Sequence, residues 1–330
     1  MANSRDMKSC WIKSEGGKTA FEFRDVPMPQ PKPGEIVVRT GAASLNRGEL
    51  LASIGWHGLD QPKPAGRDLS GEVHAVGEDV TRFRVGERVM ARAHGAFSEY
   101  VPVSEHLVVP MPDRLSWEQA AAVPIAFVTA HVSLYTYGRV KAGEWVLIAG
   151  ATSGVGVASL QAAKYAGAKV IGTSGSTEKL DRLKSLGMDA GIHARGGDFS
   201  AQVMETTGGR GANLALNLVG GSMFPGCLKS LANQGRLVIV GYVDGVMKCE
   251  IDLETVHGKR IEISGVSNAY LTPAERAGGA RTFAGDLRPA FNEGRIVPVI
   301  DRVFPFDELP AAKAYVENNS HVGKVVVRIP

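Results

Sequence analysis

The stretch that most constrains the fold runs from Trp145 to Lys179. A short apolar run, Val146–Ile148, precedes a glycine-rich turn, and a second apolar run follows at Lys169–Thr173. The first run is too short for a helix and glycine flanks it, so a buried parallel strand fits it best. Between the runs, apolar residues recur at helical spacing up to Gly167, a typical helix stop. The sequence therefore predicts a strand, a turn, a helix that begins near Gly156, and a second strand.

The glycine turn has the properties of a dinucleotide-binding loop. Gly150, Gly154 and Gly156 permit a tight turn and a close approach of the backbone to a pyrophosphate, whose charge the N–H groups of a helix N-terminus attract. The strict Gly-x-Gly-x-x-Gly fingerprint is not matched, because Ala151 and Ser153 stand at its first two glycine positions. The flanking strands and helix supply the context that such a motif requires. A glycine-rich connection in another α/β fold is the alternative.

Composition and charge are those of a soluble globular protein. The 330 residues are 44% hydrophobic and 22% charged, and this length predicts two domains. A net charge of +3, without a concentrated run of Lys and Arg, argues against a nucleic-acid partner. Cys10, Cys227 and Cys249 form no Cys-x-x-Cys pair, which argues against a disulfide framework and a structural zinc site. The N-terminus lacks the apolar core of a secretory signal and no apolar run could span a bilayer, so we expect a cytoplasmic protein that binds no membrane.

The order of the predicted elements divides the chain. Short β-like segments fill the region before about residue 120, and helical character begins at Ser116, which forms a capping-box pattern with Gln119. From Trp145 onward strands and helices alternate, which predicts a parallel, doubly wound sheet. The predicted strands are 145–149, 169–173, 190–193, 213–218 and 236–242, and the predicted helices are 177–186, 200–206 and 222–231. After about residue 265 we expect two helices, 272–278 and 307–317, and a strand at 324–329.

Several spaced motifs carry a family resemblance across nearly the whole chain. They are Gly66–Val73, Val85–Val89, Gly95–Tyr100, Thr129–Ala130, Gly150–Gly156 and His321–Val325. With them the sequence resembles the medium-chain dehydrogenase/reductase family, and within it the zinc-free, zeta-crystallin-like quinone oxidoreductases. The resemblance implies an α/β fold in which a doubly wound Rossmann domain is inserted in a β-rich, GroES-like catalytic domain. The implied boundaries are 1–124 and 265–330 for the catalytic domain and 125–264 for the Rossmann domain.

The zinc ligands of this family's alcohol dehydrogenases are not matched. Asn46 lies in the segment where the first Cys is expected, and Gly66-Arg67-Asp68 stands where such enzymes begin Gly-His-Glu. The four-cysteine structural lobe is also missing, so we expect no metal. Without a Lewis acid, alcohol oxidation is disfavoured, and reduction of a quinone or an activated double bond is the natural chemistry.

The end of the second strand indicates which nicotinamide cofactor binds. An acid there normally accepts hydrogen bonds from the ribose 2′-OH of NAD, but Thr173–Ser176 contains none, and Lys179 and Arg182 follow. These hydroxyls and cations suit a 2′-phosphate, so the expected cofactor is NADPH. An ordinary solvated helix residue is the alternative for Lys179. Arg195 is a hypothetical second contact to the adenosine phosphate.

The resemblance implies further cofactor contacts. Asn217 is expected near the ribose or pyrophosphate, Val240–Tyr242 and Val266–Asn268 near the nicotinamide, and Thr129 close to the cofactor. The predicted cofactor-binding set is Thr129, Ala151, Thr152, Ser153, Gly154, Val155, Gly156, Ser174, Gly175, Lys179, Arg195, Asn217, Val240, Gly241, Tyr242, Val266, Ser267 and Asn268.

Two residues are the candidates for catalysis. Hydride addition to a conjugated carbonyl leaves an enolate that needs stabilisation and then a proton. The loop around His57 stands where related enoyl-thioester reductases carry a tyrosine donor, so His57 is the candidate general acid, with a surface loop histidine as the alternative. Asn46 is the candidate contact to the substrate carbonyl or the nicotinamide, because its amide can donate to a developing oxyanion.

The sequence thus predicts an NADPH-dependent reductase that acts on a small-molecule electrophile, a quinone or an enone. An enoyl-thioester or acrylate-type reductase is the alternative enzyme, which predicts a basic pocket rim with Arg47 and Arg67 as candidate members. A non-catalytic NADPH-binding structural protein is the alternative of another class. The resemblance also implies a homodimer joined at an edge strand, for which the segment around Ile251 and residues 261–264 is the candidate.

Overall fold

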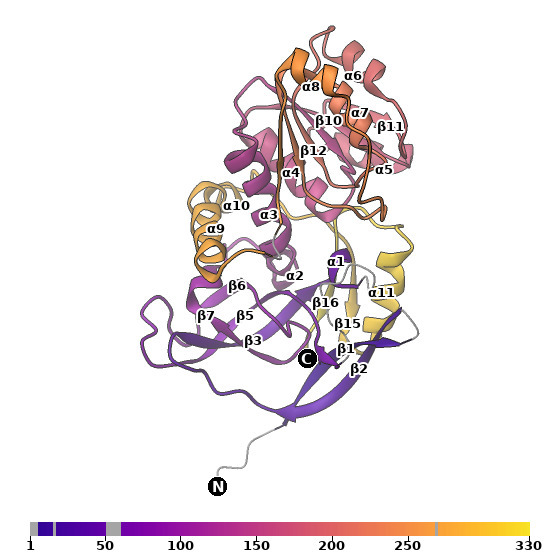
Figure 1. Cartoon of the computed structure of the whole chain (residues 1–330). Coiled ribbons are helices and arrows are strands. Elements are labelled where there is room, and N and C mark those ends of the chain that lie inside the picture. Colours follow the sequence, from indigo (N-terminus) through magenta and orange to yellow (C-terminus); the bar gives the residue numbers. More distant parts are fainter. Residues whose placement is uncertain (1–5, 16–17, 51–60, 268–269) are drawn as a thin grey trace. The chain divides into compact units, whose positions relative to one another are not determined.

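A computed structural model of the chain describes residues 6–15, 18–50, 61–267 and 270–330 (Figure 1). The chain divides into two compact units. Unit 1 consists of Met1–Ile125 and Thr272–Pro330, and unit 2 of Ala126–Leu271. The domain boundaries expected after residues 124 and 264 stay a prediction.

Unit 2 is built on a six-stranded parallel sheet with the strand order β11-β10-β9-β12-β13-β14. The order runs outward from β9 in both directions, which is the topology of a doubly wound Rossmann fold and confirms the predicted fold class. The strands are β9 (Trp145–Ala149), β10 (Lys169–Ser174), β11 (Ala190–His193), β12 (Ala212–Asn217), β13 (Leu231–Ile239) and β14 (Glu262–Gly265). The helices are α3 (Pro124–His131), which enters the unit, then η3 (Val132–Tyr137), α4 (Gly154–Tyr165), α5 (Thr177–Lys184), α6 (Ser200–Thr206), α7 (Phe224–Lys229) and α8 (Leu253–Lys259).

The central strands of unit 2 are apolar because helices cover both faces of the sheet. Val146 to Ala149 on β9 are all fully buried, as a parallel strand inside a sheet requires. On the more polar helix α5 only Leu180 and Leu183 are buried, so this helix presents one narrow apolar face. β13 begins at Leu231 rather than at the predicted residue 236, and the preceding helix ends correspondingly early, at Lys229.

Unit 1 contains a seven-stranded sheet and a three-stranded sheet. The larger has the order β15-β16-β3-β5-β6-β8, with β7 also paired to β3, and the smaller has the order β2-β1-β4. In Figure 1 the yellow strands β15 and β16 join the indigo strand β3, so the two ends of the sequence share one sheet. The strands are β1 (Asp6–Glu15), β2 (Lys18–Pro27), β3 (Glu35–Ser44), β4 (Lys63–Pro64), β5 (Asp68–Val76), β6 (Arg88–Arg92), β7 (Tyr100–Ser104), β8 (Val108–Pro110), β15 (Ile300–Pro305) and β16 (Lys324–Arg328).

The helices of unit 1 are short apart from α9. They are α1 (Arg47–Leu50), η2 (Glu105–Leu107), α2 (Trp117–Ala121), α9 (Pro273–Asp286), α10 (Arg288–Asn292), η4 (Phe306–Glu308) and α11 (Leu309–Glu317). The predicted capping box at Ser116 is confirmed at the start of α2. Helix α9 continues through Gly278 and Gly279 to Asp286, beyond its predicted end at residue 278. Among the described residues, no helix has both the length and the apolar character needed to cross a membrane.

The returning C-terminal segment completes the core of unit 1. Leu69 on β5 and Phe97 lie in one buried apolar cluster with Val325 and Val327 of β16 and Leu309 of α11. Residues from both ends of the sequence are therefore needed to bury this core, which is why the pattern of the chain loosens after residue 265 without forming a third domain.

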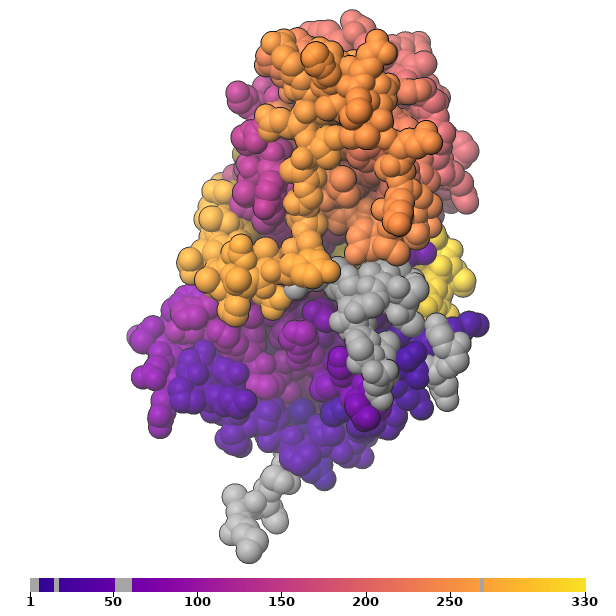
Figure 2. Space-filling view, viewed as in Figure 1, coloured from indigo at the N-terminus to yellow at the C-terminus, as the bar shows by residue number. Residues whose placement is uncertain are grey.

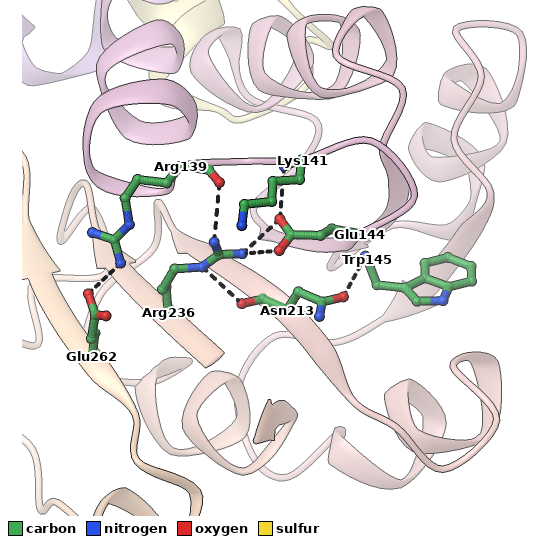
Figure 3. A network of polar contacts seen from close by, with 7 residues as sticks. All are labelled: Arg139, Lys141, Glu144, Trp145, Asn213, Arg236 and Glu262. Carbon is green, nitrogen blue, oxygen red and sulfur yellow. Dashed lines mark hydrogen bonds and ion pairs between the residues drawn. The ribbon is translucent and has the colours of Figure 1, made fainter. Parts of the chain in front are cut away.

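A largely buried ion pair between Arg236 and Glu144 lies near the amino-terminal edge of the unit 2 sheet (Figure 3). The Nη2 atom of Arg236 lies 2.7 Å from both carboxylate oxygens of Glu144. The same guanidinium donates to the carbonyl of Arg139 at 3.2 Å and to the carbonyl of Asn213 at 3.4 Å. The Asn213 side chain in turn accepts from the N–H of Trp145 at 2.9 Å. The network thereby joins β13, β12 and β9 at the edge of the sheet opposite the carboxyl ends of the strands.

We predict that Arg236→Met lowers the free energy of unfolding by about 3 kcal/mol, because it leaves the Glu144 carboxylate buried without its cation. The double variant Glu144→Gln/Arg236→Met is expected to recover part of this loss. The control is Glu262→Gln, whose pair with Arg139 is exposed and contributes less than about 1 kcal/mol. Denaturant titrations measure all three, and equal losses for Arg236→Met and Glu262→Gln would contradict the prediction.

Candidate functional site

Most of the predicted cofactor residues lie at one edge of the unit 2 sheet. Residues 151–156 follow β9, Ser174 ends β10 and Gly175 follows it, Arg195 follows β11, Asn217 ends β12, residues 240–242 follow β13 and residues 266–267 follow β14. Because all six strands are parallel, their carboxyl ends lie along the same edge, where ligands of open α/β sheets bind. Asn268 lies outside the described residues. Thr129 is buried on α3, where its carbonyl accepts a hydrogen bond from Ser133 Oγ at 2.7 Å.

The turn between β9 and α4 depends on two of its glycines. Gly150 has a φ of +84°, a conformation that L side chains rarely adopt. A Cβ on Gly156 would lie 2.4 Å from the carbonyl oxygen of Gly150, so only glycine permits this approach of helix and turn. Ser153 caps the helix by accepting the N–H of Gly156 at 3.1 Å. The helix therefore begins at Gly154 rather than near Gly156, and its first N–H groups face the turn, where they attract an anion.

The end of β10 carries hydroxyls and cations. Arg195 donates through Nε to the carbonyl of Gly175 at 3.1 Å, and its side chain covers the position that a Cβ on Gly175 would take. Thr152 Oγ1 and Ser174 Oγ are 3.4 Å apart, which connects the β9 turn to this corner. Ser176 caps α5 and accepts the N–H of Lys179, so Lys179 lies in the first helical turn after the strand.

Asn217 holds a loop in place. Its Oδ1 accepts the N–H groups of Val219 and Gly220, both at 3.0 Å, and its Nδ2 donates to the carbonyl of Gly220 at 2.8 Å. The side chain is fully buried, so its amide shapes the loop after β12. The sequence reasoning missed Asp244, which accepts hydrogen bonds from the N–H and hydroxyl of Ser222 and orders the same region. A single acid in a loop gives no periodic signal that would have found it.

In unit 1, the predicted residue Asn46 belongs to a buried polar cluster around Asp68. Asp68 is 0% exposed, and its Oδ2 accepts from Ser44 Oγ at 3.1 Å and from Asn46 Nδ2 at 3.0 Å. The ammonium of Lys324 lies 3.4 Å from the same oxygen and donates to Asn46 Oδ1 at 2.7 Å. The other carboxylate oxygen of Asp68 accepts the N–H of Ile125 at 2.9 Å. Both ends of the Asn46 amide are thus held by charged partners.

Glu49 is the second acid of this cluster, and no sequence pattern pointed to it. Its Oε1 accepts the N–H of Asn46 at 2.7 Å, and its buried Oε2 has no hydrogen-bond partner among the described residues. Burial is the main cause that raises the pKa of the Glu49 carboxyl to about 7, and the Asp68 charge adds to it, while the hydrogen bond from the Asn46 N–H and the charges of Lys324 and Arg67 act in the opposite direction. Near neutral pH the Glu49 carboxyl is therefore present in both its protonated and its ionised form.

Two further predicted residues belong to unit 1, His57 and Arg47. His57 lies outside the described residues. Arg47 donates to the side chain of Asn319, near the end of α11, and burial lowers the pKa of its guanidinium. In the described part of the chain, no group of three or more His, Cys, Asp or Glu residues is arranged to hold a metal ion.

Both parts of the chain match known domain types. Residues 32–113 match the alcohol dehydrogenase GroES-like domain, and residues 154–280 match the domain described as zinc-binding dehydrogenase. One component of the phenolphthiocerol/phthiocerol polyketide synthase of Mycobacterium tuberculosis is 32% identical over 324 residues, which are 97% of this chain but 15% of that protein. The quinone oxidoreductase of Sus scrofa is 29% identical over 320 residues, 94% of each chain.

Solved structures agree with these matches. The quinone oxidoreductase of Pseudomonas syringae pv. Tomato DC3000 has a TM-score of 0.86 and 30% identity, covering 98% of this chain and 100% of its own. The mycobacterial protein Rv1454c, solved in complex with NADPH, has a TM-score of 0.88 and 27% identity, covering 98% and 99%. A GroES-like part combined with a Rossmann sheet defines an oxidoreductase of the alcohol dehydrogenase type. Within that class, the chain belongs to the medium-chain dehydrogenase/reductase family and to its quinone oxidoreductase-like members.

We predict that Glu49 makes the protein less stable as the pH rises. Its pKa is about 7 in the folded chain against a usual 4.5, so the unfolded chain releases this proton first. The contribution of Glu49 to the free energy of unfolding is fully present below pH 4.5 and decreases between pH 4.5 and 7. Above pH 7 the free energy of unfolding stays lower than below pH 4.5 by at most about 3 kcal/mol. Glu49→Gln should therefore be the more stable protein above pH 7, and thermal unfolding across pH 4.5–8 measures this.

The control for this prediction is Glu205→Gln, an exposed acid on α6. It should keep the pH dependence of the unchanged protein. If Glu49→Gln and Glu205→Gln show the same dependence, Glu49 does not retain its proton in the folded chain.

Proposed function

We propose that the chain is an NADPH-dependent reductase that transfers hydride to a quinone or an α,β-unsaturated carbonyl compound without a metal. The observation that carries the proposal is the corner at the end of β10, where Arg195 lies against Gly175, Lys179 lies in the first turn of the next helix, and hydroxyls replace the acid that NAD would need. The relative named quinone oxidoreductase and the neighbour solved with NADPH support the same chemistry.

The residues present fit this cofactor. The capped N-terminus of α4 and the close turn at Gly150 suit a pyrophosphate, and Ser174, Lys179 and Arg195 suit a 2′-phosphate. The loop that Asn217 shapes would hold the adjacent ribose, while residues 240–242 and 266–267 would hold the nicotinamide. When bound, NADPH would supply the hydride, and the protein would hold the nicotinamide in position.

Unit 1 would stabilise the charge that develops on the substrate. Lys324 donates to Asn46 Oδ1, and this polarises the amide so that its N–H becomes a stronger donor. The other Asn46 Nδ2 hydrogen makes only a long contact of 3.5 Å to Glu49 Oε1, so it would be the one to donate to a developing oxyanion. His57 remains the proposed proton donor for an enolate, whereas solvent can protonate a hydroquinone anion.

A second reaction, reduction of an enoyl thioester or acrylate, is favoured by the similarity to the solved CurK enoyl reductase, which is 29% identical with a TM-score of 0.85 and covers 97% of this chain. Oxidation of NADPH and of NADH, measured side by side against quinones, enones and enoyl thioesters, tests the proposal and ranks the two reactions. NADPH binding without turnover across this panel would overturn the reductase and favour a non-catalytic NADPH-binding protein.

We predict that Lys179→Gln and Arg195→Gln each raise the KM for NADPH about tenfold, because each removes a charged contact to the 2′-phosphate. The KM for NADH should change less than twofold, so the preference between the cofactors narrows. Lys184→Gln, at the exposed far end of the same helix α5, is the control and should leave both constants unchanged. Equal rises of the KM for NADPH and the KM for NADH would show that Lys179 and Arg195 do not contact the 2′-phosphate.

We also infer a homodimer joined through unit 2. The edge strand β14 and the segment before it expose apolar side chains in sequence, and Figure 2 shows this orange segment at the surface. These side chains are Val246, Met247, Ile251, Leu253 and Ile263. An exposed apolar strip beside an open sheet edge is typical of an interface.

The dimer is tested with Leu253→Asp, at a side chain that is 70% exposed and therefore not needed for folding. Light scattering should find a dimer for the unchanged chain and a monomer for the variant at micromolar concentration. Val85→Asp, at an exposed apolar residue of unit 1, is the control and should remain dimeric. A dimer that survives Leu253→Asp would locate the interface elsewhere.

A further inference from the structure

Glu49, the third residue of α1, caps the start of this helix. Its Oε1 accepts the N–H of Asn46 at 2.7 Å, and its own N–H donates to the carbonyl of Asn46 at 3.1 Å. A glutamate at this position of a helix often reaches back in the same way. The cap uses only one of the two carboxyl oxygens, because the buried Oε2 has no hydrogen-bond partner among the described residues.

Two other helices of unit 1 show that such a cap does not require a buried carboxyl. At the start of α2, Gln119 Oε1 accepts the N–H of Ser116 at 3.1 Å, so a neutral amide makes the same bond. At the start of α9, Glu275 Oε2 accepts the N–H of Thr272 at 2.7 Å, and this carboxylate is exposed. A buried carboxyl, in contrast, must be removed from water. Capping alone therefore does not account for the acid at Glu49.

The cation nearest to the polar cluster is already used by other groups. The Lys324 ammonium has three hydrogens, and it donates to the carbonyl of Leu45 at 2.9 Å and to Asn46 Oδ1 at 2.7 Å. Its third partner is Asp68 Oδ2, at 3.4 Å. No hydrogen of this ammonium remains for Glu49. The carboxyl of Glu49 is therefore buried beside an acid without a hydrogen bond from the cation, which favours its uncharged form.

The surrounding charges leave this balance in place. Burial is the main cause that raises the pKa of the Glu49 carboxyl to about 7, and the Asp68 charge adds to it. The hydrogen bond from Asn46 and the charges of Lys324 and Arg67 act in the opposite direction. Helix α11, which packs on α1, has its own pairs. These are Lys313 with Glu317 at 2.6 Å, Tyr315 with Asp301 at 2.7 Å, and the Glu317 charge acting on Arg47.

The Asn46 amide has one orientation in this cluster. Its Oδ1 faces the Lys324 ammonium, which can only donate, and its Nδ2 donates to the Asp68 carboxylate at 3.0 Å. The second Nδ2 hydrogen makes only the 3.5 Å contact to Glu49 Oε1. An ionised Glu49 would attract this hydrogen and would place a negative charge beside any oxyanion that the amide binds. An uncharged Glu49 leaves the hydrogen available.

We propose that Glu49 is a positioning residue that must be uncharged for the second Nδ2 hydrogen of Asn46 to bind the oxyanion that hydride transfer creates. The inference rests on the proposed function, in which Asn46 donates to that oxyanion. The hydride adds to the β-carbon of the enone, and the electron pair of the double bond moves to the carbonyl oxygen. Glu49 keeps its proton throughout, since the enolate takes its proton from His57 or solvent. The reaction therefore slows as Glu49 ionises.

The first test measures the binding of an oxyanion without turnover. Pentafluorophenol, which is mostly a phenolate at the pH values used, is titrated into the full chain by calorimetry. The Kd of the phenolate should rise about tenfold from pH 6 to pH 8, because the uncharged fraction of a carboxyl with a pKa of about 7 falls by this factor. Glu49→Gln, which can cap α1 as Gln119 caps α2, should bind at both pH values as the unchanged chain does at pH 6.

Two further variants are the controls for this binding. Glu275→Gln makes the same replacement in the exposed cap of α9 and should keep the tenfold change. Asn46→Ala should weaken binding at pH 6 about tenfold or more, because it removes the donor. The proposal is overturned by an equal pH dependence in Glu49→Gln and the unchanged chain, by weak binding to Glu49→Gln at both pH values, by an unaltered Kd in Asn46→Ala, or by no binding at pH 6.

The second test measures the reduction of 2-cyclohexenone at saturating NADPH. From pH 6 to pH 8 the kcat should fall about tenfold and the KM for the enone should change less than twofold, because the full negative charge forms only in the transition state. Glu49→Gln should keep at pH 8 the kcat that the unchanged chain has at pH 6, and Glu275→Gln should follow the unchanged chain. A purely structural role would instead lower the kcat of Glu49→Gln at every pH, which would contradict the proposal.

The two tests separate this inference from the proposed function. Phenolate binding that loses its pH dependence in Glu49→Gln, without oxidation of NADPH by any quinone, enone or enoyl thioester, would retain the role of Glu49 towards Asn46 and reject the reductase. Reduction of the enone with one pH profile in the unchanged chain and in Glu49→Gln would retain the reductase and reject the role of Glu49.

Discussion

The buried ion pair between Asp68 and Lys324 is the interaction on which unit 1 depends. Asp68 begins β5 and Lys324 begins β16, so the pair joins the early and late parts of the sequence inside one sheet. Both charges are removed from water, and such a pair is tolerable only when the remaining hydrogen-bonding capacity is used. Ser44, Asn46, Ile125 and the carbonyl of Leu45 use it. The orientation of Asn46 and the environment of Glu49 both follow from this arrangement.

The two units treat buried charge in different ways. Unit 2 pairs Arg236 with Glu144 at the edge opposite the carboxyl ends of its strands. Unit 1 places its buried pair, Asp68 and Lys324, among hydrogen bonds from Ser44, Asn46 and Ile125.

The parts of the fold that could be predicted from the sequence are those that local sequence patterns determine. The strands and helix from Trp145 to Thr173 and the capping box at Ser116 follow from short-range periodicity and hydrogen bonding, and the structure confirms them. Helix α9 was predicted too short, because Gly278 and Gly279 resemble a helix stop when packing is unknown. The cluster of Glu49, Asp68 and Lys324 had no signal at all, since its members meet only when distant strands pair. The roles assigned to the cofactor residues stay predictions.

The position of β16 has a consequence for synthesis. Residues 126–271 are contiguous, so unit 2 can fold as soon as they leave the ribosome. Unit 1 cannot, because β16 occupies a place inside its sheet, between β15 and β3. Until residues 324–328 are made, Ala42 to Ser44 of β3 have an open backbone edge towards that place, able to pair with any other extended chain. The nascent protein therefore passes through a stage in which this part of β3 is unpaired, and it ends when β16 is made and pairs with β3.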